Sequence, residues 1–462
     1  MRDAAVAIGL RLAYPETARA LAEARASQWL SPDQLHELSW RRLQETLFRA
    51  YETVGFYRRK FEAAGIHPSD IRAPRDLCAV PLTTKDELRQ ALAGPGPFSQ
   101  AVDPERVQLL YTTGSTGKPL AIPIDRQGKH ERLAITFRDI EWYGHRLGDR
   151  NARVWGRGPA LALSKRARLV QRLKVGVFGR RMELVSHQYD APEDAPIGEA
   201  RLAHWCRELR RYRPKVLDGY VSALCVLARY ILDNDIHDLG CTAVATGGEY
   251  LSDAARSLIS RAFECPVYNR YGSSELGFIA HECGADSNHR LHVNAEGLWL
   301  EVLRDGAPAL AGETGNIVVT DFTNRAAPLI RYVTGDLGVA PGASDRCACG
   351  RGLPLISSVQ GRINDVFVLP GGKKLVSHMW HELFHQPFVN QFQVVQHRRD
   401  LVQVDVVLAG QPREVEYLAL KARVHAALPG CDVTWREVSH VEPGPGGKFR
   451  HTRSLLAEAA AL

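Results

Sequence analysis

The sequence lacks an apolar run of eighteen residues, and this absence argues against a transmembrane helix. The short apolar run from Ala4 to Leu10 is followed by Arg11 and by no cleavage-like pattern, so we expect no signal peptide. A large excess of one charge is also lacking, because 59 Lys and Arg stand against 52 Asp and Glu, a net charge of +7 over 462 residues. This balance permits an acidic small ligand and gives no indication of nucleic-acid binding.

Paired cysteines are scarce as well. The chain has nine cysteines, an odd number, and most stand alone, which is typical of small core residues in a reducing compartment. We therefore expect a cytoplasmic protein, and the length predicts two or more domains. The isolated cysteines are Cys78, Cys206, Cys225, Cys241, Cys265 and Cys431.

A Walker A loop is lacking too, although residues 111–119 are YTTGSTGKP. That pattern needs a glycine where Thr112 stands and a Ser or Thr where Pro119 stands. The glycines, the hydroxyl groups and Lys118 still supply the backbone freedom, the donors and the positive charge that a phosphate chain requires. We interpret the segment as a nucleotide-binding turn between two strands, because Pro119 opens an extended run and not a helix.

Capping and periodicity signals predict an alternation of helices and strands. Ser31 and Pro32 open a long amphipathic helix, and Thr84 with Glu87 forms the capping box of another. The first strands alternate with helices as in a βαβ unit, and the later ones alternate in polarity as in an antiparallel sheet. The predicted strands are 107–111, 242–245, 267–269, 298–303, 316–322 and 329–336.

The C-terminal part predicts a separate small domain, with a hairpin near 366–375, strands near 392–395, 402–408 and 433–438, and a helix near 414–427. We therefore expect an α/β protein in two parts. Residues 1–364 would form a large N-terminal domain of α/β sheets plus a small antiparallel barrel or sheet. Residues 365–462 would form a small mobile α+β domain.

Two carboxylates follow predicted strands and suit a nucleotide site. Glu275 comes after Gly272 and two serines, where a carboxylate opposite a phosphate loop can hold Mg²⁺ together with the phosphates. Asp336 comes after Gly335 at a strand end, where it can accept hydrogen bonds from a ribose.

Taken in order, five segments resemble the motifs of the adenylate-forming superfamily of acyl-CoA ligases, luciferases and peptide-synthetase adenylation domains. The segments are YTTGSTGKP at 111–119, YGSSE at 271–275, RYVTGD at 331–336, GRIND at 361–365 and GGKFR at 446–450. The N-terminal helices, with residues 56–58 and 81–85, and the CACGR run at 347–351 are similar to the branch of phenylacetate-CoA ligases, coenzyme F390 synthetases and CapK proteins.

The resemblance implies a role for each motif. Lys448 and Arg362 would be catalytic together with Glu275, since fixed cations and Mg²⁺ offset the charge that spreads over the phosphoryl oxygens. The C-terminal domain would turn as a lid about Asn364 or Asp365, although Asn364 departs from the Asp of many relatives. The implied nucleotide-binding residues are Thr112, Thr113, Gly114, Ser115, Thr116, Gly117, Lys118, Gly247, Gly248, Glu249, Asn269, Arg270, Tyr271, Gly272, Ser273, Asp336 and Arg362.

Three cysteines stand apart from the others and predict a structural Zn²⁺ site. Cys347 and Cys349 form a tight knuckle, and Cys283 lies among histidines, so three thiolates and one imidazole would complete a tetrahedron. His281, His289 and His292 are all candidates for the fourth ligand. His292 is the first choice, because its surroundings resemble the Leu-His pattern of the branch. Buried free cysteines are the alternative.

These features predict an ATP-dependent, Mg²⁺-requiring enzyme that adenylates a carboxylic acid and transfers the acyl group, most simply to CoA. An amide-forming ligase or an adenylyltransferase would use the same chemistry, with an amine or a carrier protein as acceptor. A P-loop phosphotransferase and a non-catalytic nucleotide-binding protein are the remaining alternatives. The acid and the oligomeric state stay open, since Tyr143, Trp155, His187 and Tyr220 suit an aromatic acid and a plain core equally.

Overall fold

The computed structural model describes residues 2–92, 96–111, 121–157, 181–188, 198–342, 344–362, 366–375, 378–384, 386, 388–441 and 451–456. Its secondary structure is mixed α/β, which confirms the predicted fold class. The chain divides into two compact units, one formed by residues of 1–149 and 268–359 and the other by residues of 150–267 and 360–462. The predicted domain boundary between residues 364 and 365 lies outside the described residues.

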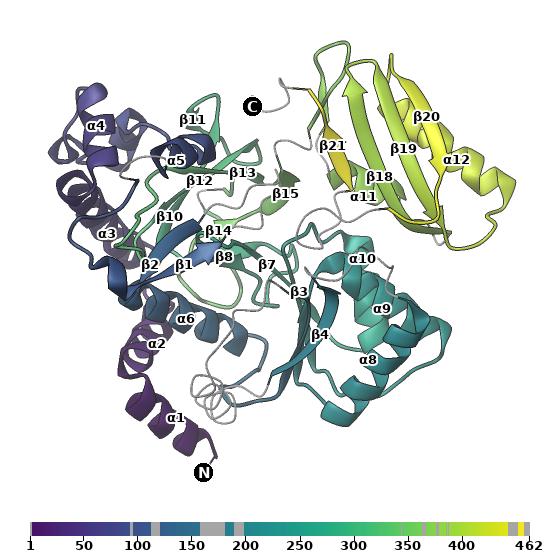
Figure 1. Ribbon diagram of the computed structural model, residues 1–462, viewed down its shortest axis with the longest axis horizontal. Coiled ribbons are helices and arrows are strands. Elements are labelled where there is room, and N and C mark those ends of the chain that lie inside the picture. The colour runs from purple at the N-terminus through teal and green to yellow at the C-terminus, as the bar shows by residue number, and fades with distance from the viewer. Residues whose placement is uncertain are drawn as a thin grey trace. The chain divides into compact units, whose positions relative to one another are not determined.

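Two N-terminal helices of the first unit, those that begin at Pro32 and Lys85, start where the capping signals predicted (Figure 1). The Ser31 hydroxyl accepts a hydrogen bond from the Gln34 N–H at 3.2 Å, and the Gln34 side chain accepts one from the Ser31 N–H at 3.0 Å. Thr84 and Glu87 form the same reciprocal pair. The helices are α1 (Arg2–Ala13), α2 (Pro15–Ser27), α3 (Pro32–Thr53), α4 (Gly55–Ala63), α5 (Lys85–Leu92) and α6 (Arg126–Glu141).

The sheets of the first unit are antiparallel. β1 (Val107–Tyr111) pairs with β2 (Ala121–Asp125), so the predicted nucleotide-binding turn does connect two strands. A second sheet has the order β11-β10-β12-β13, and a third run has the order β7-β8-β9-β14. Their bounds are β7 (Val267–Ser273), β8 (Gly277–His281), β9 (Leu291–Val293), β10 (Leu298–Arg304), β11 (Ala307–Pro308), β12 (Thr314–Asp321), β13 (Tyr332–Val339) and β14 (Leu355–Ile356).

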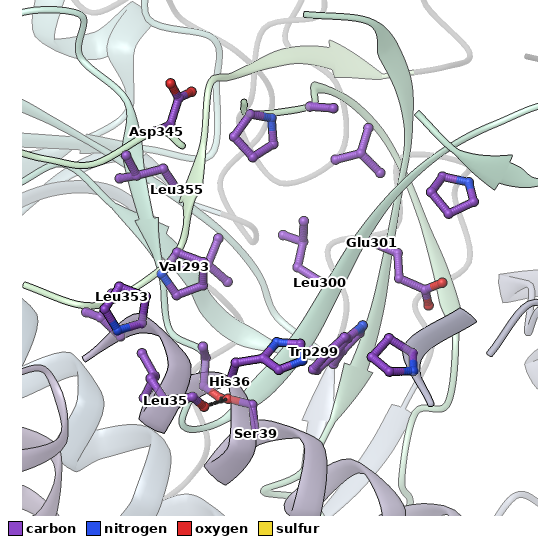
Figure 2. A pocket seen from close by; sticks show the side chains of 18 of the residues that line it. Leu35, His36, Ser39, Val293, Trp299, Leu300, Glu301, Asp345, Leu353 and Leu355 are labelled. Atoms are coloured by element: carbon purple, nitrogen blue, oxygen red, sulfur yellow. Dashed lines mark hydrogen bonds between the residues drawn. The ribbon is translucent and has the colours of Figure 1, made fainter. Parts of the chain in front are cut away.

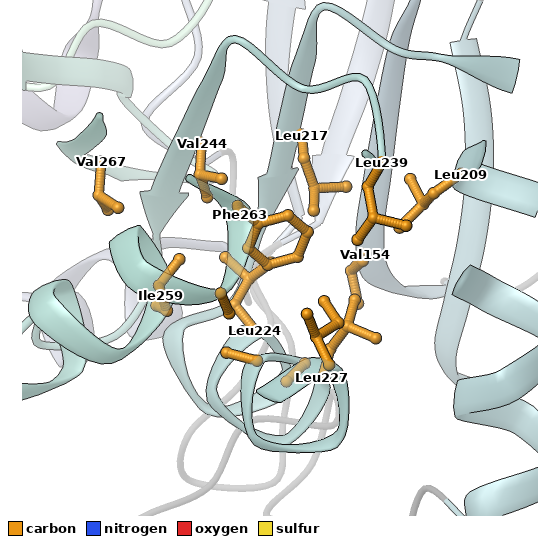
Figure 3. Close-up of a cluster of buried hydrophobic side chains, with 14 of the residues drawn as sticks. Val154, Leu209, Leu217, Leu224, Leu227, Leu239, Val244, Ile259, Phe263 and Val267 are labelled. Carbon is orange, nitrogen blue, oxygen red and sulfur yellow. The ribbon is translucent and has the colours of Figure 1, made fainter. Parts of the chain in front are cut away.

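The second unit contains a run of parallel strands in the order β4-β3-β5-β6. Helices α8, α9 and α10 group beside these strands in Figure 1. Figure 3 shows the core that they enclose, where Val154, Leu217, Leu224 and Leu227 are fully buried. Each such leucine stabilises the fold by about 1.5–3 kcal/mol. The elements are β3 (Asn151–Arg157), β4 (Arg181–Gln188), α8 (Glu199–Tyr212), β5 (Val216–Gly219), α9 (Val221–Asp233), β6 (Ala243–Gly247) and α10 (Asp253–Phe263).

The C-terminal part of the chain is the α+β fold that the sequence predicts. Its sheet has the order β20-β19-β18-β21, and the buried Trp380 belongs to the core between this sheet and its helices. Ahead of the sheet come β15 (Ser358–Arg362) and the hairpin of β16 (Phe367–Val368) with β17 (Lys374–Leu375). The other elements are α11 (His378–Phe384), β18 (Val389–Arg398), β19 (Leu401–Leu408), α12 (Glu414–Ala427), β20 (Asp432–Glu437) and β21 (Thr452–Ser454).

The isolated cysteines are mostly packed, with one exception. Cys206 and Cys265 are buried, and burial raises the pKa of the Cys225 thiol to about 12. Cys78 is exposed, so its prediction as a core residue is wrong: it lies in a short 3₁₀ turn whose apolar anchor is Leu77. In the part of the chain that the structure describes, no helix combines the length and the apolarity needed to cross a bilayer.

Candidate functional site

Several predicted site residues cannot be placed. Residues 112–118, the hinge residues 364 and 365, and Lys448 lie outside the described part of the chain. The strands on either side of the first segment are described, and Tyr111 pairs with Ala121 at their ends. These strands join the turn to the first unit, which also carries Glu275 and Asp336.

Residues 274–276 form the tight connection between β7 and β8, and Gly272 and Ser273 are the last residues of β7 before it. Gly272 pairs with Phe278, and Ser273 pairs with Gly277. A Cβ on Gly272 would lie 2.4 Å from the carbonyl oxygen of Gly277, so only glycine fits there without a shift of the backbone. The Ser273 hydroxyl accepts a hydrogen bond from the Leu276 N–H. This bond closes the turn and fixes the backbone of the residue between them, Glu275.

The two predicted carboxylates are each held by a tyrosine from the other motif. The Tyr271 hydroxyl donates to Asp336 Oδ2 at 2.9 Å, and the Tyr332 hydroxyl donates to Glu275 Oε1 at 3.1 Å. The backbone around Asp336 is fixed as well, because its N–H donates to the Thr334 hydroxyl, which itself donates to a carbonyl of β12. The structure therefore brings the YGSSE and RYVTGD segments together, as a shared nucleotide site requires.

Arg331 anchors the strand that carries Asp336. Its guanidinium makes two hydrogen bonds to the Glu301 carboxylate, at 2.9 and 3.0 Å, and a third to the Val80 carbonyl. The side chain is only 3% exposed, and the residue has a φ of +40°, which a non-glycine residue adopts only under strain. Thr83 also bonds to this strand on both sides of Tyr332, so the segment just before α5 fixes its position.

Asn269 and Arg270 lie in β7 ahead of the turn. The Asn269 N–H donates to the Glu282 carboxylate at 3.0 Å. The Arg270 guanidinium lies over the Phe278 ring at 4.8 Å from its centroid and is buried. Both residues are thus held in the strand that leads to Tyr271.

The remaining predicted nucleotide-binding residues belong to the second unit. Gly247 ends β6, and Gly248 has a φ of +78°, which turns the chain sharply. The Glu249 carboxylate accepts hydrogen bonds from the Ser222 N–H and hydroxyl at 2.7 and 2.9 Å and so caps α9. Arg362 ends β15 and is half-buried.

Four side chains converge at the predicted metal site. One ligand atom each from Cys283, His292, Cys347 and Cys349 lies within 4.8 Å of all the others, and three of these residues are buried. The sulfurs of Cys283 and Cys347 are 3.4 Å apart, and Cys349 Sγ is 3.4 Å from His292 Nε2. Zinc ligands at about 2.3 Å from sulfur and 2.0 Å from nitrogen span similar edges of a tetrahedron, so the donor set fits Zn²⁺.

The imidazole of His292 is oriented for metal binding. Its Nδ1 lies 3.4 Å from the Leu353 carbonyl oxygen, which favours a proton on Nδ1 and leaves the lone pair of Nε2 toward the cysteines. Burial lowers the pKa of His292 to about 4 and raises the pKa of the Cys347 thiol to about 12. The neutral imidazole is the form that binds a metal, whereas forming the Cys347 thiolate in this pocket needs a cation.

The other two candidate histidines have different surroundings. His281 Nε2 is 2.9 Å from Asp139, and its Nδ1 is 2.8 Å from the Tyr143 hydroxyl, so the ring belongs to a buried network with α6. His289 is about half exposed and faces Glu282 at 3.9 Å. Of the three candidate histidines, His292 is the one whose ring nitrogen lies close to all three cysteine sulfurs.

Sequence reasoning missed the residues that pack around this cluster. The Arg351 guanidinium lies over the rings of Trp142 and Trp29, at 4.5 and 5.0 Å from their centroids, and donates to the Gln28 side chain. Trp142 in turn makes an edge contact with His292. Arg351 closes the CACGR run, so the signal was present, but its partners lie more than two hundred residues away in the chain.

The aromatic residues considered for an acyl pocket stack in pairs. Trp155 and Tyr220 stack with centroids 3.9 Å apart, and Tyr143 stacks on Tyr268 at 4.3 Å. Tyr220 and Tyr143 are buried. These pairs favour a packing role for those four rings, while the side chain of His187 lies outside the described set.

No protein-family model matches the chain. Curated relatives are the phenylacetate-coenzyme A ligases of Escherichia coli, 27% identical over 76% of this chain and 77% of the relative, and of Thermus thermophilus, 27% identical over 74% and 73%. Protein CapK of Staphylococcus aureus is 29% identical over 56% of this chain and 52% of its own length.

Solved structures share the fold. A 2-hydroxyisobutyryl-CoA ligase in its postadenylation state, in complex with 2-HIB-AMP, aligns with a TM-score of 0.75 at 20% identity, over 93% of this chain and 91% of that chain. The anthranilate CoA ligase AuaEII in complex with anthranoyl-AMP aligns with a TM-score of 0.53 at 16% identity, over 76% and 67%.

Proposed function

Because the chain belongs to the adenylate-forming superfamily, in the branch of the phenylacetate-CoA ligases, we propose that it activates a carboxylic acid with ATP and transfers the acyl group to CoA. The observation that carries this proposal is the reciprocal pairing of Tyr271 with Asp336 and of Tyr332 with Glu275. These two hydrogen bonds fix both carboxylates in the same unit of the structure that contains β1 and β2, the strands on either side of the predicted phosphate loop.

In the first half-reaction, a carboxylate oxygen of the acid attacks the α-phosphorus of ATP, and pyrophosphate leaves. Asp336 would hold the ribose hydroxyls, and Gly247–Glu249 with Asn269–Gly272 would surround the adenine. Residues 112–118 would bind the β- and γ-phosphates. Lys448 and Arg362 would offset the negative charge at the α-phosphate, where two anions approach each other.

Glu275 is the residue that would hold Mg²⁺. Its carboxylate is buried and is oriented by the Tyr332 hydroxyl, which leaves further oxygen lone pairs for a cation. When bound, Mg²⁺ neutralises phosphate charge. The Tyr332 hydroxyl would keep the Glu275 carboxylate in one orientation for the incoming nucleotide.

In the second half-reaction, the sulfur of CoA attacks the acyl carbonyl, and AMP leaves with the electron pair of the broken C–O bond. The C-terminal domain, residues 365–462, would turn between the two half-reactions, so that Lys448 serves the first one only. An amine or a carrier thiol in place of CoA would give an amide-forming or carrier-loading enzyme with the same first step.

We also propose a structural Zn²⁺ ion on Cys283, His292, Cys347 and Cys349. The support is the convergence of three sulfurs and one imidazole nitrogen within 4.8 Å, together with the hydrogen bond that orients His292. The site has four protein ligands and no open position. Its part would be to tie the loop before β14 to β8 and β9.

Acid-dependent exchange of labelled pyrophosphate into ATP tests the proposed reaction. The panel contains aryl, fatty, short hydroxylated and amino acids, and each is assayed with and without CoA. Exchange with one class, followed by thioester on addition of CoA, is the expected result. Exchange without thioester would place the acceptor among amines or carrier proteins, and no exchange with any acid would contradict the proposal.

A further inference from the structure

The first unit contains a cavity of about 620 Å³ that shares no residue with the proposed nucleotide and metal sites. Figure 2 shows it between α3 and the strands β9, β10 and β14. Most of the wall is apolar, with Leu35, Val293, Leu300, Leu353 and Leu355 among the lining residues. A cavity of this size and character is typical of a small-molecule site.

The cavity runs along the edge of β10. All six consecutive residues from Leu298 to Leu303 line it. Side chains of a strand point alternately to its two faces, so a cavity over one face would touch only every second residue. Contact with all six therefore means that the cavity follows the backbone edge of the strand.

Two residues of this edge turn their backbone polar groups into the cavity. The Val302 carbonyl accepts a hydrogen bond from the Ala309 N–H at 2.9 Å, so the backbone of Val302 points away from the neighbouring strand β12. In an antiparallel ladder every second residue points the same way. Leu300 and Leu298 thus direct N–H and C=O away from β12, toward the side on which β11 pairs only with Leu303 and Arg304.

This free edge is short. β11 pairs with β10 only at Leu303 and Arg304, which closes one end, and a turn bonded between Gly297 and Asn294 precedes the other. Backbone groups in an apolar setting are nearly always paired, by protein, water or ligand. The open stretch has room for the hydrogen bonds of about one ligand residue.

The charges at the cavity have mixed sign. Arg75, Arg346 and Asp33 are exposed, whereas Asp345 and Glu301 are paired with Arg290 and Arg331. Because charges of both signs lie at the cavity, neither an anionic nor a cationic ligand is favoured. We propose that the cavity binds a compact, uncharged, apolar secondary amide, which pairs with Leu300 as a neighbouring strand would.

The first test uses N-acetyl-L-leucine N-methylamide as the probe and the complete protein, without ATP or acid, so its outcome is independent of the proposed reaction. Calorimetric titration should detect binding. The depsi analogue, in which oxygen replaces the leucine N–H, should bind about threefold to tenfold more weakly because the bond to the Leu300 carbonyl is lost. Equal binding of the two probes, or no binding of the amide, would overturn the proposal.

The second test fills the cavity. Leu300→Phe and Ala309→Leu each place extra carbon atoms in it and should weaken binding by about tenfold or more. Leu310→Phe is the matched control, because Leu310 is 71% exposed, does not line the cavity and should leave binding unchanged. Thermal unfolding checks that each variant is folded.

Hydrogen exchange of the wild-type protein supplies a readout that needs no variant. Exchange of the Leu300 amide should slow on addition of the amide, since the Leu300 N–H acquires an acceptor. Unchanged exchange over 298–302 at saturating probe, or tight binding that survives both filling substitutions, would show that the probe binds elsewhere and would contradict the assignment.

Discussion

The Tyr271 hydroxyl donates a 2.9 Å hydrogen bond to Asp336, a residue 65 positions later in the chain. The reverse pairing, from Tyr332 to Glu275, spans 57 positions. Each carboxylate is therefore oriented by the motif that it does not belong to. The two motifs therefore form one hydrogen-bonded unit.

Tyr271→Phe should raise the KM for ATP by about tenfold, because a hydrogen bond to a charged group is lost while the ring packing stays. Pyrophosphate exchange at varied ATP concentration measures the effect. Tyr332→Phe is the matched control on the other carboxylate and should alter the Mg²⁺ dependence more than the KM. An unchanged KM in Tyr271→Phe would remove Asp336 from the nucleotide site.

Lys448→Ala should abolish adenylation and leave nucleotide binding nearly intact, because its ammonium serves the charge of the transition state and not the ground state. The rate of acyl-adenylate formation and the Kd of ATP are measured separately. Acyl-AMP supplied from outside should still react with CoA in this variant. Loss of ATP binding would mean that Lys448 has a different role.

Arg331→Met should destabilise the protein by about 3–5 kcal/mol, since it leaves the Glu301 carboxylate without its buried partner. The double variant Arg331→Met with Glu301→Met should recover much of that loss, because no charge is then left unpaired. Urea unfolding of the single and double variants gives the comparison. A double variant no more stable than the single one would show that the lost hydrogen bond to the Val80 carbonyl dominates.

Removal of the proposed zinc should loosen the first unit. We expect about one zinc ion per chain by elemental analysis and a lower Tm after treatment with a strong chelator. Cys347→Ser should lose the metal, whereas Cys78→Ser, at an exposed cysteine, should keep it. If the purified protein contains no zinc and the chelator leaves its Tm unchanged, the three cysteines and His292 do not bind a structural metal.

The half-buried His451 predicts a pH dependence of stability. Burial lowers its pKa to about 4, so the ring is neutral in the folded protein while the unfolded chain takes up a proton below about pH 6.5. Stability should therefore fall as the pH drops from 6.5 to 4, by about 3 kcal/mol at the lower limit.

Urea unfolding at pH 7 and pH 5 measures this effect as a difference between proteins. His451→Phe should reduce the loss of stability on going to pH 5, because the replacement has no proton to accept. The exposed His397→Phe is the control and should keep the wild-type loss. Equal pH dependence in all three proteins would assign the effect to other buried groups.

Much of the fold was determined by local sequence. Ser31 and Thr84 mark the helix starts because their caps are completed three residues away, and the strands of residues 298–304 and 314–321 alternate in polarity over single short segments. The five motifs were also recognisable in order, since each is a contiguous run. Adjacent residues suffice for all of these features.

Only the tertiary structure decided the pairing between distant segments. The sequence offered three histidines near Cys283, and only the fold placed one of them, His292 in β9, close to the three cysteines. The tyrosine to carboxylate pairs and the Arg351 contact with Gln28 likewise join residues far apart in the chain. Composition and period set which elements form, whereas the geometry between elements sets which side chains meet, because contacts of high sequence separation leave no local pattern.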